Sequence, residues 1–342
     1  MSMNPDDPAQ AEAFREKIRL LTHELRKVIV GQDGTIFHVI LAIVAGGHVL
    51  LEGVPGLGKT LLVRSLAAAL RLKFQRVQFT PDLMPADLLG TNILVEEPGS
   101  IPRFEFSPGP IFCNLLLGDE INRATPKTQS ALLEAMQEHA VTIGGKTRAL
   151  EAPFFVLATQ NPLDMEGTYP LPEAQLDRFF FKLKVSYPDR AAFEEILDRT
   201  TGPEAVQITP ILDGATLCGL GAFARAVPVP PEVRTRAVDL VMATHPETRE
   251  ADERVRRFVR YGASPRAGQA LLLAAKIRAL LDGRFHAATE DILACALPAL
   301  RHRVLLNFEA QAEGHDPDTL LEEVCQARAS RWGTPWPVPQ SV

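Results

Sequence analysis

A glycine-rich loop that ends in lysine and threonine carries the clearest chemistry in this sequence. It follows the apolar run His48-Val-Leu-Leu51 and consists of Gly53, Val54, Pro55, Gly56, Leu57, Gly58, Lys59 and Thr60. Glycines let backbone N–H groups wrap a pyrophosphate, the lysine reaches the β- and γ-phosphates, and the threonine hydroxyl is placed for Mg²⁺. The loop therefore predicts a nucleoside triphosphate site.

The alternative to a nucleotide site is a glycine-rich turn without a ligand, and the residues around the loop disfavour it. A short apolar strand precedes the loop, and apolar or small residues recur behind it at helical spacing. They are Leu61, Leu62, Ser65, Leu66 and Ala69. A strand, a phosphate loop and a buried crossover helix in this order favour the nucleotide site.

Two adjacent carboxylates follow a second apolar strand, Asn114-Leu-Leu-Leu-Gly-Asp119-Glu120. Asp119 would anchor Mg²⁺ through its water shell, and Glu120 would polarise the water that attacks the γ-phosphate. Alone, the pair also fits a solvated strand end. Combined with the phosphate loop it predicts hydrolysis of the triphosphate, because each motif supplies what the other needs.

A polar residue ends a third buried strand, Pro153–Ala158, which continues into Thr159-Gln-Asn161-Pro162. Ligands of open α/β sheets bind at the carboxyl ends of the central strands. Asn161 is therefore a candidate for orienting the attacking water. The alternative is an ordinary turn residue before proline.

Composition excludes several other classes of protein. The chain has 342 residues, 46% of them hydrophobic, which is enough for two domains with cores of their own. A net charge of −6 gives no overall reason to bind nucleic acid. Four cysteines without CxxC spacing argue against a zinc site or a disulfide framework. No signal peptide or membrane span is evident, so a cytoplasmic location is expected.

The elements that must position these residues alternate between helix and strand in the first half of the chain, which predicts a parallel α/β sheet. Residues 12–28 and the segment ending near 46–47 have helical patterns, and 74–79 and 179–185 have strand patterns. Residues 82–90 predict a short helix interrupted by Pro85, and 125–126 predict the start of another.

Two hairpins are expected to leave the sheet. Residues 91–96 and 103–107 predict two strands around the turn Pro98–Ser100, and residues 140–150 predict a hairpin around Gly144-Gly145. Helical patterns dominate from Asp189 onward. We expect a nucleotide-binding core over 1–187, a helical domain over 188–305 and a C-terminal tail over 306–342.

Several motifs in this order resemble the MoxR family of AAA+ ATPases, over about residues 15–305. They include the phosphate loop and the stretches Gly118–Ala124, Glu134–Glu138, Ala158–Pro162, Pro172–Phe179 and Gly262–Ala267. The resemblance implies an αβα parallel-sheet core followed by an α-helical lid, and a homo-oligomeric ring, commonly of six subunits, that hydrolyses ATP between neighbours. It also implies that the two hairpins face a partner or the pore.

The resemblance implies further site residues. Arg178 would be an arginine finger supplied to the neighbouring subunit, the alternative being an ion pair with Asp177. Arg266 would be a lid arginine that reports on the phosphate. Whether it acts in its own subunit or on a neighbour stays open, since a helix over 250–261 could shift the lid.

Three other residues have roles that the sequence leaves open. Arg123 would be an interface residue, or simply an arginine at a helix start. Val30 and Gly31 would contact the adenine, or form an ordinary junction between two helices.

Together these features predict an ATPase that remodels or matures a protein client in a chaperone-like manner, since no second catalytic constellation is evident. The resemblance adds a partner with a von Willebrand factor A domain, which must be a separate polypeptide. Two alternatives are a DNA-acting motor using Lys146 and Arg148, disfavoured by the negative charge, and a nucleotide-gated binding module with slow turnover.

Overall fold

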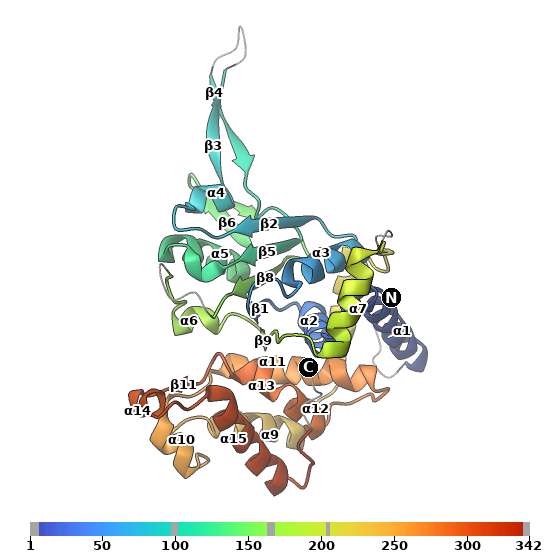
Figure 1. The fold of residues 1–342 in the computed structure, drawn as a ribbon, viewed down its shortest axis with the longest axis vertical. Coiled ribbons are helices and arrows are strands. Elements are labelled where there is room, and N and C mark those ends of the chain that lie inside the picture. Colours follow the sequence, from blue (N-terminus) through green and yellow to red (C-terminus); the bar gives the residue numbers. More distant parts are fainter. Residues whose placement is uncertain (1–6, 97–101, 163–167, 203–205, 338–342) are drawn as a thin grey trace.

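The structure, a computed structural model, describes residues 7–96, 102–162, 168–202 and 206–337 (Figure 1). A five-stranded sheet lies at its centre. Its strands are β1 (Val49–Glu52), β2 (Phe74–Gln78), β5 (Leu115–Asp119), β8 (Phe155–Gln160) and β9 (Phe181–Lys184). They pair in the order β2-β5-β8-β1-β9, and every pair is parallel. The predicted parallel sheet is confirmed.

Helices cover both faces of this sheet. Along β1, Val49 and Leu51 belong to the hydrophobic core that includes α1 (Pro8–Arg26), α2 (Asp33–Ala45) and α3 (Lys59–Ala69). Leu50 points the other way, into a core shared with α5 (Pro126–Glu138). Because successive side chains of a strand face opposite sides, the near-continuous apolar runs of β1, β5 and β8 produce a three-layer αβα arrangement.

Two hairpins extend from the α5 side of the core, as predicted. The strands β3 (Gly90–Val95) and β4 (Arg103–Pro108) form an antiparallel arm that projects far beyond the sheet (Figure 1). The strands β6 (Ala140–Ile143) and β7 (Lys146–Ala149) form the second hairpin. The Arg148 guanidinium lies 3.9 Å from the ring centroid of Phe106 and so links the two hairpins. The expected turn at Pro98–Ser100 lies outside the described residues.

Pro85 lies at the start of a helix, not in the middle of one as expected. It does not interrupt a helix over 82–90 but opens the helix α4 (Pro85–Leu89), after Met84 in an extended conformation. A proline lacks a backbone N–H, and the first turn of a helix needs none there.

Helices dominate the chain after β9 and most of them form a second layer below the core (Figure 1). They are α7 (Arg190–Thr201), α8 (Gly214–Ala226), α9 (Pro231–Met242), α10 (Glu253–Phe258), α11 (Pro265–Leu281), α12 (Thr289–Ala294), α13 (Ala296–Leu300), α14 (Phe308–Ala312) and α15 (Pro317–Arg331). The expected helix over 250–261 is shorter than predicted. It ends at Phe258 and continues into β10 (Val259–Tyr261), which pairs with β11 (Leu305–Leu306).

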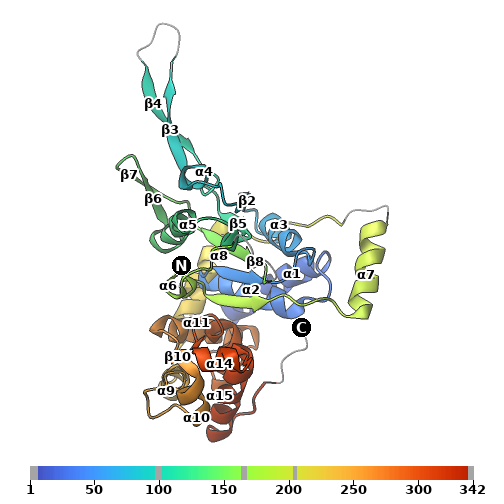
Figure 2. The ribbon, with the colours of Figure 1, turned by 60° about the vertical axis from the view of Figure 1, so that its left-hand side comes forward.

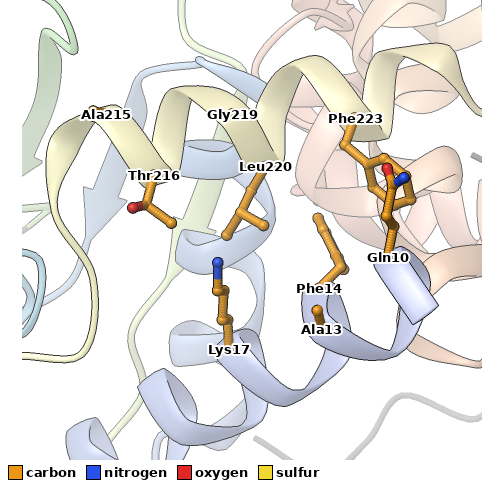
Figure 3. Close-up of a pocket in the computed structure, with 9 residues that line it drawn as sticks. All are labelled: Gln10, Ala13, Phe14, Lys17, Ala215, Thr216, Gly219, Leu220 and Phe223. Carbon is orange, nitrogen blue, oxygen red and sulfur yellow. The ribbon is translucent and has the colours of Figure 1, made fainter. Parts of the chain in front are cut away.

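Two helices of the second half connect the layers. In Figure 3, α8 runs beside α1, with Leu220 and Phe223 directed toward Phe14 across a groove of about 440 Å³. The rings of Phe14 and Phe223 lie 6.0 Å apart. Farther along the chain, α15 packs against α9 and α13, and its residues Leu320 and Val324 are buried in the same core. The helices α14 and α15 thus lie within the segment expected as a tail.

No helix in the described parts of the chain combines the length and the apolar character needed to cross a membrane. The four cysteines are free thiols, three of them buried.

Candidate functional site

The phosphate loop connects β1 to α3. Gly56 and Gly58 have φ values of +88° and +74°, a left-handed region that favours glycine. Gly53 is required for a different reason, because a Cβ there would lie 2.7 Å from the carbonyl oxygen of Val185, the residue after β9. The loop is therefore fixed by backbone conformation at its tip and by close packing at its base.

Lys59 is the first residue of α3. Its Nζ donates to the carbonyl oxygens of Gly53 and Val54, the second at 2.8 Å. Burial lowers the pKa of Lys59, and the nearby carboxylates of Asp119 and Glu120 oppose this effect. The Lys59 ammonium group thus lies within the loop. Its hydrogen bonds can pass from these carbonyl oxygens to the phosphate oxygens of a nucleotide.

A cavity of about 380 Å³ lies in front of the loop. It brings together the candidates that the sequence placed at three separate strand ends. Its lining consists of Pro55, Gly56, Leu57, Gly58, Lys59, Thr60, Leu61, Arg76, Gln78, Asp119, Glu120, Thr159 and Asn161. Phosphate-binding, acidic and amide groups converge here because β1, β5 and β8 are parallel neighbours with their carboxyl ends at one edge.

Asp119 ends β5 and is buried. Its Oδ1 accepts a hydrogen bond from the Thr159 hydroxyl at 2.5 Å, and its Oδ2 accepts from Nη2 of Arg76 at 2.7 Å. Arg76 lies on the neighbouring strand β2. The carboxylate is thus oriented by one residue on each side of its own strand.

Glu120 follows Asp119 in a left-handed conformation, with φ +55°. Its backbone N–H donates to the Thr159 hydroxyl at 2.8 Å. Its Oε2 accepts from Nε2 of Gln78 at 2.8 Å and lies 3.1 Å from Nε of Arg123 in the short helix η1 (Ile121–Arg123). The left-handed backbone ends the strand direction at Glu120, and the polar neighbours hold its carboxylate at the cavity.

Asn161 lies directly after β8 and is 6% exposed. It lines the same cavity as Lys59 and Glu120. A residue that orients a water molecule for attack on the γ-phosphate would have to line this cavity, as Asn161 does.

Four residues of this cavity were not predicted as site residues: the apolar Leu61 and the polar Arg76, Gln78 and Thr159. Arg76 and Gln78 share one face of β2, and Gln78 is in register with Asp119. The alternation of residues 74–79 indicated the strand but not that it would lie next to β5. Thr159 precedes Asn161 by two positions and could have been found once β8 was placed beside β5.

A second pocket of about 360 Å³ adjoins the other side of the loop. Val28, Val30 and Leu57 contribute to its wall, as do Tyr187 and Phe193 near the start of α7. An apolar pocket next to a phosphate loop has the character of a nucleobase site.

Helix α7 stands beside the core (Figure 2). Its residues Phe193, Ile196, Arg199 and Thr200 line one side of this pocket. The Arg199 guanidinium on α7 donates to the carbonyl oxygens of Arg26 and Lys27, at 2.9 and 2.6 Å. Gly31, at φ +70°, allows the close approach, since a Cβ there would lie 2.7 Å from the Cβ of Ala192.

Arg178 and Arg266 do not line the phosphate cavity of their own chain. Arg178 follows α6 (Glu173–Leu176), and its Nη1 donates to the Leu133 carbonyl oxygen at 2.6 Å. It makes no ion pair with Asp177 within the described structure. The Asp177 carboxylate instead accepts from Ser264 and from Arg303, at 2.7 and 2.8 Å, and lies 3.5 Å from Nη1 of Arg266.

The potential metal ligands fit Mg²⁺ by their chemistry. Thr60 and Asp119 line one cavity and offer a hydroxyl and a carboxylate oxygen, the hard donors that Mg²⁺ prefers. The described residues hold no group of three or more His, Cys, Asp or Glu side chains that could bind a metal by themselves. A nucleotide-linked ion with few protein ligands is compatible with this arrangement.

The fold and the site together define a phosphate-loop nucleotide-binding protein with a helical lid. Residues 48–181 match the family described as "ATPase family associated with various cellular activities (AAA)", and residues 251–324 match the AAA lid domain. The chain is 41% identical to chaperone MoxR1 of Mycobacterium tuberculosis, over 94% of this chain and 85% of that protein.

Another relative and a solved structure are similar over nearly the whole chain. Protein MoxR of Methylorubrum extorquens is 32% identical, over 89% of this chain and 92% of that protein. A crystal structure from Cytophaga hutchinsonii superimposes with a TM-score of 0.86 at 41% identity, over 93% of this chain and 96% of that one. The chain belongs to the MoxR family of AAA ATPases.

Proposed function

We propose that this chain hydrolyses ATP to ADP and phosphate and uses the cycle to remodel or mature a protein client. The observation that carries the proposal is the single cavity shared by Lys59, Asp119, Glu120 and Asn161. The name of the relative chaperone MoxR1 supports the client class.

The chemistry assigns one task to each residue. Asn161 orients a water molecule, and the Glu120 carboxylate takes its proton as the water oxygen bonds to the γ-phosphorus. The bond between the γ-phosphorus and the bridging oxygen then breaks, and its electron pair leaves on ADP. Lys59 compensates the charge on the β- and γ-phosphate oxygens.

Thr60 and Asp119 would hold Mg²⁺, Asp119 through water. The ion supplies further neutralisation of the phosphate charge when it is bound. Thr159 keeps the Asp119 carboxylate directed into the cavity.

We further propose a homo-oligomeric ring, of six subunits by family resemblance, in the cytoplasm. Arg178 lies outside the phosphate cavity of its own chain, which supports a role as an arginine finger for the neighbouring subunit.

Arg266 would report on the phosphate in its own subunit or a neighbouring one. Arg123, which pairs with Glu120, is an interface candidate. A separate protein with a von Willebrand factor A domain is the proposed partner.

Two substitutions test the ATPase assignment. Glu120→Gln keeps the cavity but removes the proton acceptor, so ATP should bind with a Kd near that of the wild type while turnover falls by about 10³-fold. Lys59→Ala should lose ATP binding. A fluorescent ATP analogue and phosphate release measure the two properties, and wild-type turnover by either variant would contradict the mechanism. Slow turnover by the wild type itself would favour the nucleotide-gated binding module.

A capture experiment tests the client. The Glu120→Gln variant, isolated from its native cells in the presence of ATP, should retain a client protein that wild-type protein releases. Recovery of the chain's own subunits alone would contradict remodelling.

The DNA-acting alternative is weakened by the second hairpin. Arg148 is engaged with Phe106, which leaves Lys146 as the exposed basic residue of β6 and β7. Stimulation of the ATPase by single-stranded DNA, lost at raised salt, would restore this alternative.

A further inference from the structure

The backbone on both sides of Arg178 is held by the second helical layer as well as by the sheet, where the Phe180 N–H donates to the His48 carbonyl oxygen at 2.7 Å. His302 and Arg303 follow α13, which lies below β9 and α6 (Figure 1). His302 Nε2 donates to the Phe179 carbonyl oxygen at 3.0 Å. The Arg303 guanidinium donates to the carbonyl oxygens of Asp177, Phe179 and Phe180, at 3.1, 2.6 and 3.3 Å.

A buried ion pair completes this contact. Nε of Arg303 donates to Oδ1 of Asp177 at 2.8 Å, and the two side chains are 3% and 18% exposed. Ser264, the N-cap of α11, donates to the same carboxylate. One guanidinium therefore fixes the residue before Arg178 and the two residues after it, an arrangement that needs the planar fork of donors that arginine has and lysine lacks.

Arg178 itself makes one hydrogen bond to the core, from Nη1 to the Leu133 carbonyl oxygen. Its position thus depends on the helical layer through Arg303 and on the core through Leu133. A movement of the helical layer relative to the sheet would therefore pull on the Asp177 and Phe179 carbonyl groups that flank Arg178, while Phe180 stays tied to the sheet.

We propose that Asp177 and Arg303 are positioning residues that couple the lid of one subunit to the arginine finger it supplies to its neighbour. The inference rests on the proposed role of Arg178 in a ring. Closure of the lid on a nucleotide in one subunit would thereby reposition Arg178 in the next subunit's site, so that neighbouring sites turn over in a linked order. Misplacement of a transition-state contact by about 1 Å can cost about 10²-fold in rate.

Mixed assemblies test the coupling, because they separate the subunit that supplies the finger from the one that supplies the site. Subunits with Lys59→Ala keep the finger but do not bind ATP, and subunits with Arg178→Ala keep the site but lack the finger. Mixing the two should recover ATPase activity that neither has alone, with co-assembly verified by differential tags. No recovery would overturn the proposed trans-acting finger itself.

The substitution Arg303→Lys is then added either to the Lys59→Ala subunits or to the Arg178→Ala subunits, and each mixture is assayed. On the Lys59→Ala subunit it should reduce the recovered activity by about 10- to 10²-fold, while the KM for ATP stays within about twofold. On the Arg178→Ala subunit it should leave the recovery intact, which also shows that the variant folds and assembles. Equal loss in both placements, or no loss in either, would overturn the coupling.

A matched control breaks another contact between the layers. Lys184→Met removes the ion pair between Lys184 on β9 and Asp318 on α15, which lie 2.7 Å apart. Lys184 follows Arg178 by six residues and contacts α15 rather than the segment after α13. It should leave the recovery unchanged in both placements. A loss as large as that of Arg303→Lys would show that any weakening of the layer contact suffices, and would contradict a specific role for Arg303.

Discussion

At the scale of single residues, the acidic pair depends on one hydroxyl. Thr159 accepts from the Glu120 backbone N–H and donates to the Asp119 carboxylate, so it sets the direction of both acids. The sequence predicted both acids and Asn161 but not Thr159, because the hydroxyl acquires this role only when β8 lies next to β5. Arg76 and Gln78 were missed for the same reason, since both act across a strand pair.

Replacing Thr159 by valine should therefore lower kcat by about 10- to 10²-fold. The substitution preserves the shape of the side chain but leaves the Glu120 N–H without its acceptor and lets the Asp119 carboxylate turn. ATP binding, measured with a fluorescent analogue, should change by less than about threefold because the phosphate loop is untouched. Thr159→Ser is the control and should retain most activity. A kcat for the valine variant within twofold of the wild type would refute this role.

At the scale of elements, the hydrophobic periodicity of the sequence predicted those helices and strands that have a clear local pattern. The five sheet strands and both hairpins were found because their apolar runs or alternation are local properties. The pair β10 and β11 was missed because its strands have three and two residues, too short for a pattern. The pairing of strands forty or more residues apart, and the packing of α8 on α1, depend on tertiary contacts that a local pattern does not contain.

One histidine connects three elements of the core. His48 precedes β1, its Nε2 donates to the Met136 carbonyl oxygen on α5, and its Nδ1 accepts from the Val156 N–H on β8. Burial lowers the pKa of His48 to about 4. Both hydrogen bonds require the neutral ring, because protonation would place a second N–H against that of Val156.

The stability of the core should consequently fall in mild acid. The pKa in the folded chain lies below the ordinary value of 6.5, so the unfolded chain takes up the proton first as pH falls. The contribution is complete above pH 6.5 and is lost toward pH 4, in total about 3 kcal/mol. In urea unfolding, the difference in free energy between wild type and His48→Gln should shrink by about 2 kcal/mol from pH 7 to pH 5. Parallel pH profiles would contradict this assignment.

At the scale of the whole molecule, two candidate functional regions lie apart. The phosphate cavity opens at the carboxyl ends of the strands, whereas Arg178 and Arg266 belong to the junction between the core and the lid. A single chain therefore presents a cavity in one place and candidate arginines in another, and assembly would bring the two together. The linkage of Asp177 to Arg303 gives the lid a route to the neighbouring site.

The central claim is that catalysis occurs between subunits, and its most direct measurement is the ATPase rate per subunit as a function of protein concentration. The rate should rise steeply where light scattering detects assembly. Arg178→Ala should assemble and bind ATP yet turn over about 10³-fold more slowly than the assembled wild type. A rate per subunit that is the same for the dilute monomer and the assembly, with Arg178→Ala as fast as the wild type, would contradict the account.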